Sequence, residues 1–189
     1  MIDLYKITGR LGNQMFQFAA LYSFTKSLGS DYYCQDEKWF NSSAEQIKQI
    51  FRQGNPYEPI DKVAIHVRRG DYLKPPHNSF HTDLTSTDYY EKAIEQFPDD
   101  KFLVFSDDIE WCKTRLNGSR FSYSEGHGEI DDLNLMMQCK GHIVANSSYS
   151  WWGAYLSDQK KVICPQGNKC FKDGIIRMRF PLSWQRLEF

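Results

Sequence analysis

The chain has 189 residues, a length that fits one large domain or two small ones. Its residues are 41% hydrophobic and 15% aromatic, which is enough for a packed core and argues against a disordered chain. The formal net charge is only −1, so no global field attracts nucleic acid or an anionic membrane. We therefore expect no nucleic-acid partner, and a local cluster of charges must bind any anion.

The first residues lack the charged segment followed by an apolar segment that marks a secretory signal peptide. No apolar run reaches the length of a transmembrane helix. The five cysteines are an odd number and form no Cys-x-x-Cys pair. His77 and His81 are four residues apart, but they lie in a proline-containing loop that does not read as a helix, so they are not expected to bind zinc. These features predict a cytoplasmic protein with no resident metal or cofactor.

The clearest break in the chain is the segment 54–59, which contains a glycine, an asparagine and two prolines. We place a domain boundary there, between a small N-terminal domain (1–58) and a larger C-terminal domain (59–189). Strand and helix alternate in the elements predicted before the break: residues 4–7, 15–29, 32–34 and 44–51. The first helix is apolar on nearly every side, so we expect it to be buried.

Strands and helices also alternate after the break. The predicted strands are residues 62–67, 102–105, 142–145 and 161–165, and the predicted helices end near residues 97, 117, 140 and 157. Asp88-x-x-Glu91 is a capping box that opens the first of these helices, and Gly141 is a candidate C-cap of the third. The alternation predicts an α/β fold with a parallel sheet and right-handed crossovers.

The apolar strand 62–67 ends in a cluster of charged residues. Because side chains alternate between the faces of a strand, His66 and Arg68 should share one face, with Arg69 on the other. Asp71 follows directly. Open α/β sheets bind ligands at the carboxyl ends of their strands, so this cluster suits an anion. The alternative is a salt-bridge cluster at the surface.

Two further strand ends carry complementary polar groups: Ser106, Asp107, Asp108, Asn146, Ser147 and Ser148. An arginine can bind a phosphate through two hydrogen bonds, each contributing about 1.5–3 kcal/mol. Serines and the amides at a helix start can bind a second phosphate. The Asp107 carboxylate could accept hydrogen bonds from the N–H groups of a purine such as guanine. Together these groups predict a pocket for a nucleoside diphosphate.

Each of these residues also has a structural alternative. Asp107 could serve only to cap the helix that follows it. Ser147 or Ser148 could be an ordinary helix N-cap. Trp151 and Trp152 fit the hydrophobic core better than they fit a role in stacking on a ligand.

Five stretches of the chain resemble the α-1,2-fucosyltransferase family, glycosyltransferase family 11. The longest and most specific read Gly-Arg-Leu-Gly-Asn-Gln-Met-Phe-Gln-Phe-Ala, His-Val-Arg-Arg-Gly-Asp-Tyr and Asn-Ser-Ser-Tyr-Ser-Trp-Trp-Gly-Ala. All five occur in the order typical of the family: residues 9–19, 66–72, 105–108, 146–154 and 180–184.

The resemblance implies a GT-B-like fold, with a Rossmann-type parallel-sheet donor domain and a reduced N-terminal α/β domain on the acceptor side. It implies an inverting, metal-independent fucosyltransferase of the galactoside 2-alpha-L-fucosyltransferase kind. Such an enzyme moves L-fucose from GDP-fucose to a glycan hydroxyl, for example O2 of galactose. The implied site residues are Arg68 on the diphosphate, His66 and Asp71 shaping that pocket, Asp107 on guanine, Ser147 and Ser148 on phosphate, and Asn13 facing the sugar–phosphate end of the donor.

Arg68 and Asp71 are the catalytic candidates. Arg68 would stabilise the charge left on GDP, and a general base should take the proton of the acceptor hydroxyl. Asp71, Asp36 and Glu37 are candidates for that base, and the sequence does not choose among them.

The N-terminal domain is unusually short, with only about fifty residues between the glycine motif and the arginine motif. The acceptor and the linkage therefore stay open. Alternative functions are transfer from another nucleotide sugar, a nucleotide-sugar-binding module without catalysis, or an adhesion protein that presents Arg69-Gly70-Asp71. A shortened domain would leave apolar surface uncovered, which keeps a homodimer among the partner states.

Overall fold

The computed structural model describes residues 10–26, 44–52, 58–157 and 161–189. Contacts divide the chain into two compact units, Met1–Pro56 and Tyr57–Phe189. The strands predicted at residues 4–7 and 32–34 lie outside the described residues, as does most of the break at residues 54–59. None of the helices in the described residues is both long and apolar enough to cross a lipid bilayer.

The N-terminal unit contains two described helices, α1 (Leu11–Lys26) and α2 (Ala44–Arg52), and both were predicted. Helix α1 begins earlier than expected, directly after Arg10. The expectation that α1 is buried on all sides is wrong, because Phe18 is exposed while Met15 and Ala19 are buried. The Phe18 ring meets the ring of Phe51 in α2 edge to face, with the centroids 5.6 Å apart.

In the described part of the C-terminal unit, six strands form one parallel sheet: β1 (Ile60–Val67), β2 (Phe102–Ser106), β3 (Phe121–Tyr123), β4 (Cys139–Ile143), β5 (Val162–Pro165) and β6 (Gln185–Leu187). Their order in the sheet is β3-β2-β1-β4-β5-β6. This is the order of the Rossmann fold, and it reverses direction between β1 and β4. The predicted Rossmann-type parallel sheet is therefore confirmed.

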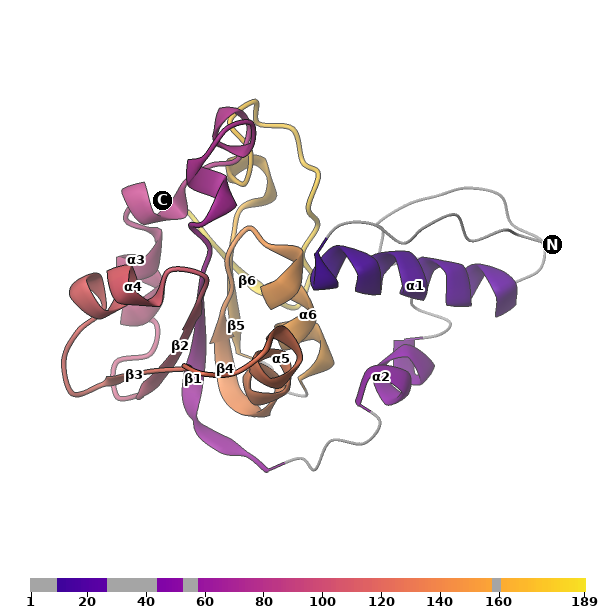
Figure 1. Cartoon of the computed structure of the whole chain (residues 1–189), viewed down its shortest axis with the longest axis horizontal. Helices are drawn as coiled ribbons and strands as arrows, with labels where there is room; N and C mark the ends of the chain where they lie inside the picture. Colours follow the sequence, from indigo (N-terminus) through magenta and orange to yellow (C-terminus); the bar gives the residue numbers. More distant parts are fainter. Residues whose placement is uncertain (1–9, 27–43, 53–57, 158–160) are drawn as a thin grey trace. The chain divides into compact units, whose positions relative to one another are not determined.

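Helices cover both faces of this sheet: α3 (Tyr89–Glu95), α4 (Ile109–Arg115), α5 (Glu129–Gln138) and α6 (Ser148–Leu156). Figure 1 shows α3 and α4 on one side and α5 and α6 on the other. The central strand β1 is buried between these two layers. Its residues Val63, Ile65 and Val67 belong to the core with α3, whereas Ala64 packs with Met136 of α5.

Short 3-10 turns follow the sheet at its carboxyl end: Asp71–Leu73, His77–Ser79, Leu84–Ser86 and Gly167–Lys169. The first three lie within the long connection between β1 and α3. They hold this connection compact over the end of β1, as Figure 1 shows.

Gly141 does not cap a helix, so that part of the sequence prediction is wrong. Helix α5 ends at Gln138, and Cys139 already begins β4. A Cβ atom at Gly141 would lie 3.1 Å from the ring of Phe97 and 3.2 Å from the carbonyl oxygen of Lys161. The glycine is needed for close packing in the sheet, and not for a left-handed turn.

The capping box at Asp88 also fails to form. Asp88 occupies the N-cap position of α3, but its side chain makes no capping hydrogen bond. Its carboxylate instead pairs with Lys92 one turn later, with 2.9 Å between Oδ2 and Nζ. The pair is exposed, so it contributes little to stability.

The buried histidines make the fold sensitive to acid. Burial lowers the pKa of His142 to about 3, and neither ring nitrogen finds a partner within the described residues. The unfolded state keeps a pKa near 6.5, so it binds more protons than the folded state between pH 3 and 6.5. Stability is complete above that window and falls as the pH decreases through it, by about 2 kcal/mol for one such histidine at pH 5.

We expect His142→Leu to flatten this pH dependence and to raise stability at pH 5. The measurement is urea unfolding of the two proteins at pH 7 and pH 5. His127 is exposed, so His127→Leu is the matched control and should leave the pH dependence unchanged. Equal losses of stability in the wild type and His142→Leu would contradict the prediction.

Candidate functional site

The predicted convergence of three strand ends is confirmed. Strand β1 lies between β2 and β4, and all three run parallel, so their carboxyl ends meet at one edge. A hydrogen bond of 3.0 Å from the Tyr72 hydroxyl to the carbonyl oxygen of Asn146 joins the chain after β1 to the chain after β4. This edge is where the strand order reverses, the position at which such sheets bind nucleotides.

Arg68 lies at the centre of this edge between two carboxylates. Its Nη2 is 2.6 Å from Oδ1 of Asp71, and its Nη1 is 3.1 Å from Oδ2 of Asp107. The guanidinium carbon lies 5.3 Å from the centre of the Tyr72 ring. The side chain is only 10% exposed, and its Nε is buried without a partner among the described residues. One N–H of this guanidinium is thus buried and left unsatisfied by the described residues.

Asp107 is held by the chain after β1, and it does not cap α4. Its Oδ1 accepts a hydrogen bond of 2.9 Å from the backbone N–H of Arg69, while its Oδ2 meets Arg68. The N-cap of α4 is the next residue, Asp108, whose side chain accepts from the N–H of Trp111. The capping alternative for Asp107 is therefore wrong, and the role proposed for it on guanine stays a prediction.

Gly70 makes the contact between Asp107 and the chain after β1 possible. A Cβ atom at this position would lie 2.3 Å from Oδ2 of Asp107, closer than any real contact. Gly70 belongs to a motif noted in the sequence, but its close packing against Asp107 was not predicted. This role could have been predicted from the position of the glycine. It lies directly beside the charged residues at a strand end, where backbone and side chain must approach closely.

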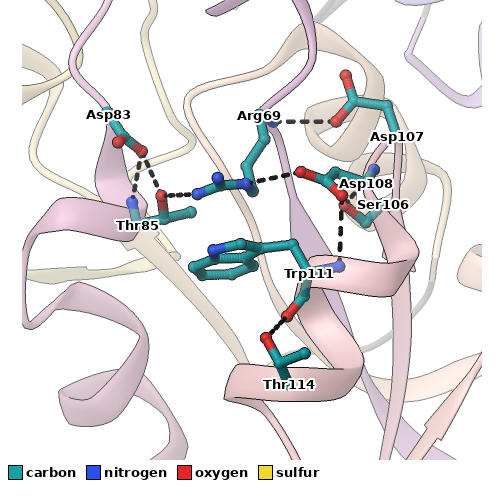
Figure 2. A network of polar contacts seen from close by, with 8 residues as sticks. All are labelled: Arg69, Asp83, Thr85, Ser106, Asp107, Asp108, Trp111 and Thr114. Atoms are coloured by element: carbon teal, nitrogen blue, oxygen red, sulfur yellow. Dashed lines mark hydrogen bonds and ion pairs between the residues drawn. The ribbon is translucent and has the colours of Figure 1, made fainter. Parts of the chain in front are cut away.

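Arg69 points to the opposite face and anchors a second network, shown in Figure 2. Its Nε pairs with Oδ2 of Asp108 at 3.0 Å, and its Nη1 donates to the Thr85 hydroxyl at 2.7 Å. Its guanidinium stacks over the ring of Trp111 at 4.0 Å. The Thr85 hydroxyl donates in turn to Asp83.

This network gives Arg69 a structural role distinct from that of Arg68. The guanidinium of Arg69 is bound on both sides and stacked, so it is not displayed as part of an adhesion tripeptide. It fixes the turn after β1 to α4 and to the loop at Thr85. Sequence reasoning placed Arg69 on the correct face but did not find Thr85 or Asp83 as its support.

His66 lies on the same face as Arg68, as the alternation of the strand requires. Its ring is buried beside Tyr149, with the centroids 5.5 Å apart. Burial, reinforced by the charge of Arg68, lowers the pKa of His66 to about 3. The imidazole is therefore neutral at physiological pH. Its role in shaping a nucleotide pocket stays a prediction, and the neutral ring would add no positive charge there.

Ser147 and Ser148 lie where the chain enters α6. Ser147 is the buried N-cap residue, yet its side chain makes no capping hydrogen bond, and Ser148 is the first residue of the helix. The ordinary capping role is thus not formed at Ser147, and contact with phosphate stays a prediction. Trp151 and Trp152 are buried in the core, as expected.

Asn146 connects the loops around this edge and was not expected to do so. Its side-chain amide donates to the carbonyl oxygens of Thr82 at 2.9 Å and of Cys170 at 3.0 Å. It thereby joins the chain after β4 to the loop before α3 and to the loop after β5. A buried asparagine next to a strand end is the sequence signal that points to such a connection.

For Asn13 and the candidate general bases, the structure gives less information. Asn13 is exposed in the first turn of α1, within the N-terminal unit, and its contact with a donor stays a prediction. Of the three candidate bases, Asp36 and Glu37 lie outside the described residues, and Asp71 pairs with Arg68. Over the part of the chain that the structure describes, no three His, Cys, Asp or Glu side chains gather as metal ligands.

The family model named Glycosyl transferase family 11 matches residues 31–172, well over half of the chain. The chain belongs to this family. The match covers β1, the charged turn at Arg68 and the ends of β2 and β4. The predicted family is therefore confirmed.

Three curated relatives support the assignment. The O-antigen biosynthesis glycosyltransferase WbnK of Escherichia coli is 38% identical over 119 residues, which cover 58% of this chain and 39% of that protein. An alpha-1,2-colitosyltransferase of E. coli is 35% identical over 143 residues, covering 66% of this chain and 49% of that protein. Galactoside 2-alpha-L-fucosyltransferase Sec1 of Mus musculus is 32% identical over 121 residues, covering 58% and 33%. The chain thus spans between a third and a half of their length.

Among solved structures, the chain is similar to the E. coli heptosyltransferase WaaC with ADP, a GT-B enzyme. The TM-score is 0.50 at 15% identity, and the match covers 97% of this chain and 51% of that one. This similarity concerns the fold alone, and it confirms the predicted GT-B-like class.

Proposed function

We propose that the chain acts as an inverting glycosyltransferase that moves L-fucose from GDP-fucose to a glycan hydroxyl without requiring a metal ion. The observation that carries this proposal is the position of Arg68. Its guanidinium is nearly buried at the edge where the strand order reverses, and its Nε has no hydrogen-bond partner among the residues that the structure describes. A fixed cation at this point of a Rossmann-type sheet suits the diphosphate of a nucleotide sugar.

The proposed reaction is a single displacement. The acceptor oxygen forms a bond to C1 of fucose while the bond from C1 to the donor phosphate breaks, and GDP leaves with the electron pair. Arg68 stabilises the charge that grows on the leaving phosphate. A carboxylate takes the proton of the acceptor hydroxyl, and Asp71, Asp36 and Glu37 remain the candidates.

Asp107 would bind the guanine base, and Ser147 and Ser148 would contact phosphate together with the first amides of α6. In the described structure Asp107 already accepts two contacts, from Arg68 and from the N–H of Arg69. A carboxylate offers about four lone-pair positions, so these contacts leave capacity for the N–H groups of a base.

A second candidate keeps the fold and changes the donor sugar. It is supported by the E. coli relative named as an alpha-1,2-colitosyltransferase, which shares 35% identity with this chain. In this case the nucleotide pocket at Arg68 would be retained, and the difference would lie in the contacts to the sugar. In either case we propose O2 of galactose as the acceptor, on the ground of the family resemblance.

Calorimetric titration with GDP and with UDP, both in EDTA, tests the nucleotide site. We expect micromolar binding of GDP, corresponding to about −8 kcal/mol, and at least tenfold weaker binding of UDP. Arg68→Ala should abolish GDP binding, because the diphosphate loses its fixed cation. Arg115 is exposed at the end of α4, so Arg115→Ala is the matched control and should bind GDP as the wild type does. Absence of GDP binding by the wild type would refute the proposal.

A further inference from the structure

Tyr72 contacts Arg68 but has no part in the proposed reaction. It follows Asp71 in the first 3-10 turn after β1. The guanidinium carbon of Arg68 lies 5.3 Å from the centre of the Tyr72 ring. A guanidinium within about 6 Å of an aromatic ring is attracted to the face of that ring. The contact therefore bears on how firmly Arg68 is held.

Two further contacts fix the Tyr72 ring itself. Its hydroxyl donates a hydrogen bond of 3.0 Å to the carbonyl oxygen of Asn146. The ring also stacks on the imidazole of His81, with the centroids 3.8 Å apart and an angle of 12° between the planes. A ring that is tied at its hydroxyl and stacked on a second ring has little freedom to turn or tilt. Tyr72 thus offers Arg68 a rigid surface.

The groups that hold the Tyr72 ring are anchored in their turn. His81 pairs with Phe171 in an antiparallel bridge, and the two rings also meet, with their centroids 5.0 Å apart. The side-chain amide of Asn146 donates to two backbone carbonyl oxygens beside that bridge, one in each segment. The chain after β1, the chain after β4 and the chain after β5 therefore meet around one tyrosine.

Arg68 needs a surface of this kind because its two ion pairs lie at one edge of the guanidinium. Nη2 meets Asp71 at 2.6 Å, and Nη1 meets Asp107 at 3.1 Å. These contacts set the direction of the group, but a flat guanidinium can still tilt about the line through its two Nη atoms. An aromatic ring against its face opposes that tilt, which would displace Nε.

The Tyr72 hydroxyl is poorly suited to act on a substrate directly. Burial raises the pKa of Tyr72 above its ordinary value, so the phenol is neutral at physiological pH. A phenol has a single proton to donate, and that proton is committed to the carbonyl oxygen of Asn146. Any effect of Tyr72 on the reaction must therefore pass through Arg68.

We propose that Tyr72 is a positioning residue that fixes the plane of the Arg68 guanidinium for its contact with the diphosphate of the nucleotide. The hydroxyl bond to Asn146 and the stack on His81 keep the ring in place for this task. The inference rests on the proposed function, because that function places a diphosphate at Arg68.

Hydrogen exchange of the Arg68 Nε–H in the ligand-free chain, followed by NMR, tests the positioning by itself. This N–H is buried and has no partner among the described residues, so its exchange reports how firmly the guanidinium is held. Tyr72→Leu removes the ring and should speed the exchange about tenfold, equivalent to about 1.4 kcal/mol. Tyr72→Phe keeps the ring but loses its hydroxyl bond, and should speed the exchange only about threefold.

Calorimetric titration with GDP and with guanosine tests the consequence for the nucleotide. Tyr72→Leu should lower the affinity for GDP about tenfold and leave the affinity for guanosine unchanged. The reason is that a tilt of Arg68 moves Nε while the Nη contacts, and with them Asp107, stay in place. Damage spread through the fold would weaken the binding of both ligands. Tyr72→Phe should retain most of the affinity for GDP.

Tyr123→Phe is the matched control for both measurements. It removes a hydroxyl of the same kind, which donates at 2.6 Å to the carbonyl oxygen of Leu116, but it does so at the edge strand β3. This variant should match the wild type in the exchange of the Arg68 Nε–H and in the binding of GDP.

Wild-type exchange of the Nε–H in Tyr72→Leu would overturn the inference, and so would an equal loss of affinity for GDP and guanosine. If Tyr72→Leu does not fold, the smaller effect of Tyr72→Phe, compared with Tyr123→Phe, decides the question. A wild type that binds no GDP, together with faster exchange in Tyr72→Leu, would refute the proposed function and leave the positioning of Arg68 in place.

Discussion

Replacing Arg68 with lysine is expected to lower the rate of fucosyl transfer by about 10²–10³-fold, nearly as much as Arg68→Ala. The guanidinium holds Asp71 with Nη2 and Asp107 with Nη1, and its buried Nε has no partner among the described residues. A lysine ammonium is a single point charge and cannot reach both carboxylates and a phosphate in fixed geometry. Conservation of charge alone should therefore not rescue the enzyme.

The measurement is the steady-state rate of GDP release from GDP-fucose, with and without a galactoside acceptor. Arg115→Lys serves as the control, since that side chain is exposed at the end of α4 and should tolerate the change. Near-wild-type turnover of Arg68→Lys would contradict the assignment of the diphosphate to Arg68. Unchanged melting of the variant would show that the loss is not a loss of fold.

Gly70→Ala is expected to lower GDP affinity at least tenfold, a change of about 1.4 kcal/mol, although residue 70 offers no side chain to a ligand. The new Cβ would lie 2.3 Å from Oδ2 of Asp107, so the carboxylate must move. That movement breaks its contact with Arg68 at 3.1 Å. The guanidinium then loses one of the two groups that fix its direction.

Calorimetric titration with GDP measures this effect. Gly128→Ala is the matched control, because a Cβ at Gly128 would find only an ordinary contact of 3.7 Å with Asp131. We expect that control to bind GDP normally. Wild-type affinity of Gly70→Ala would show that the position of Asp107 does not matter for the nucleotide.

The hydrophobic pattern of the sequence was sufficient to locate the central strands of the sheet. Strands β1, β2 and β5 are buried and apolar, so hydrophobicity located them and their polar ends. Strands β3 and β6 were missed because each has three residues and lies at an edge of the sheet, where partial exposure removes the hydrophobic signal. Gly141 was assigned to a helix end because a glycine after a lysine has the same pattern in either setting.

In the candidate site, the positions of the key residues were predicted but their contacts were not. The three strand ends were predicted because parallel neighbours share an edge, and alternation along β1 placed Arg68 and Arg69 on opposite faces. The partners of these side chains could not be predicted, because Thr85 comes from a loop whose path the sequence does not define. Asp107 and Asp108 are adjacent, and only the structure shows which of them caps α4.

The two carboxylates around Arg68 also set a condition on which anions the proposed nucleotide site would bind. Asp71 and Asp107 act as built-in competitors, since any incoming anion must share or displace them at the guanidinium. Inorganic phosphate brings only its charge, and that is opposed by both acids. A ligand that adds contacts through a base and a sugar can overcome this opposition. The arrangement would therefore keep the pocket clear of abundant small anions and reserve it for a complete nucleotide sugar.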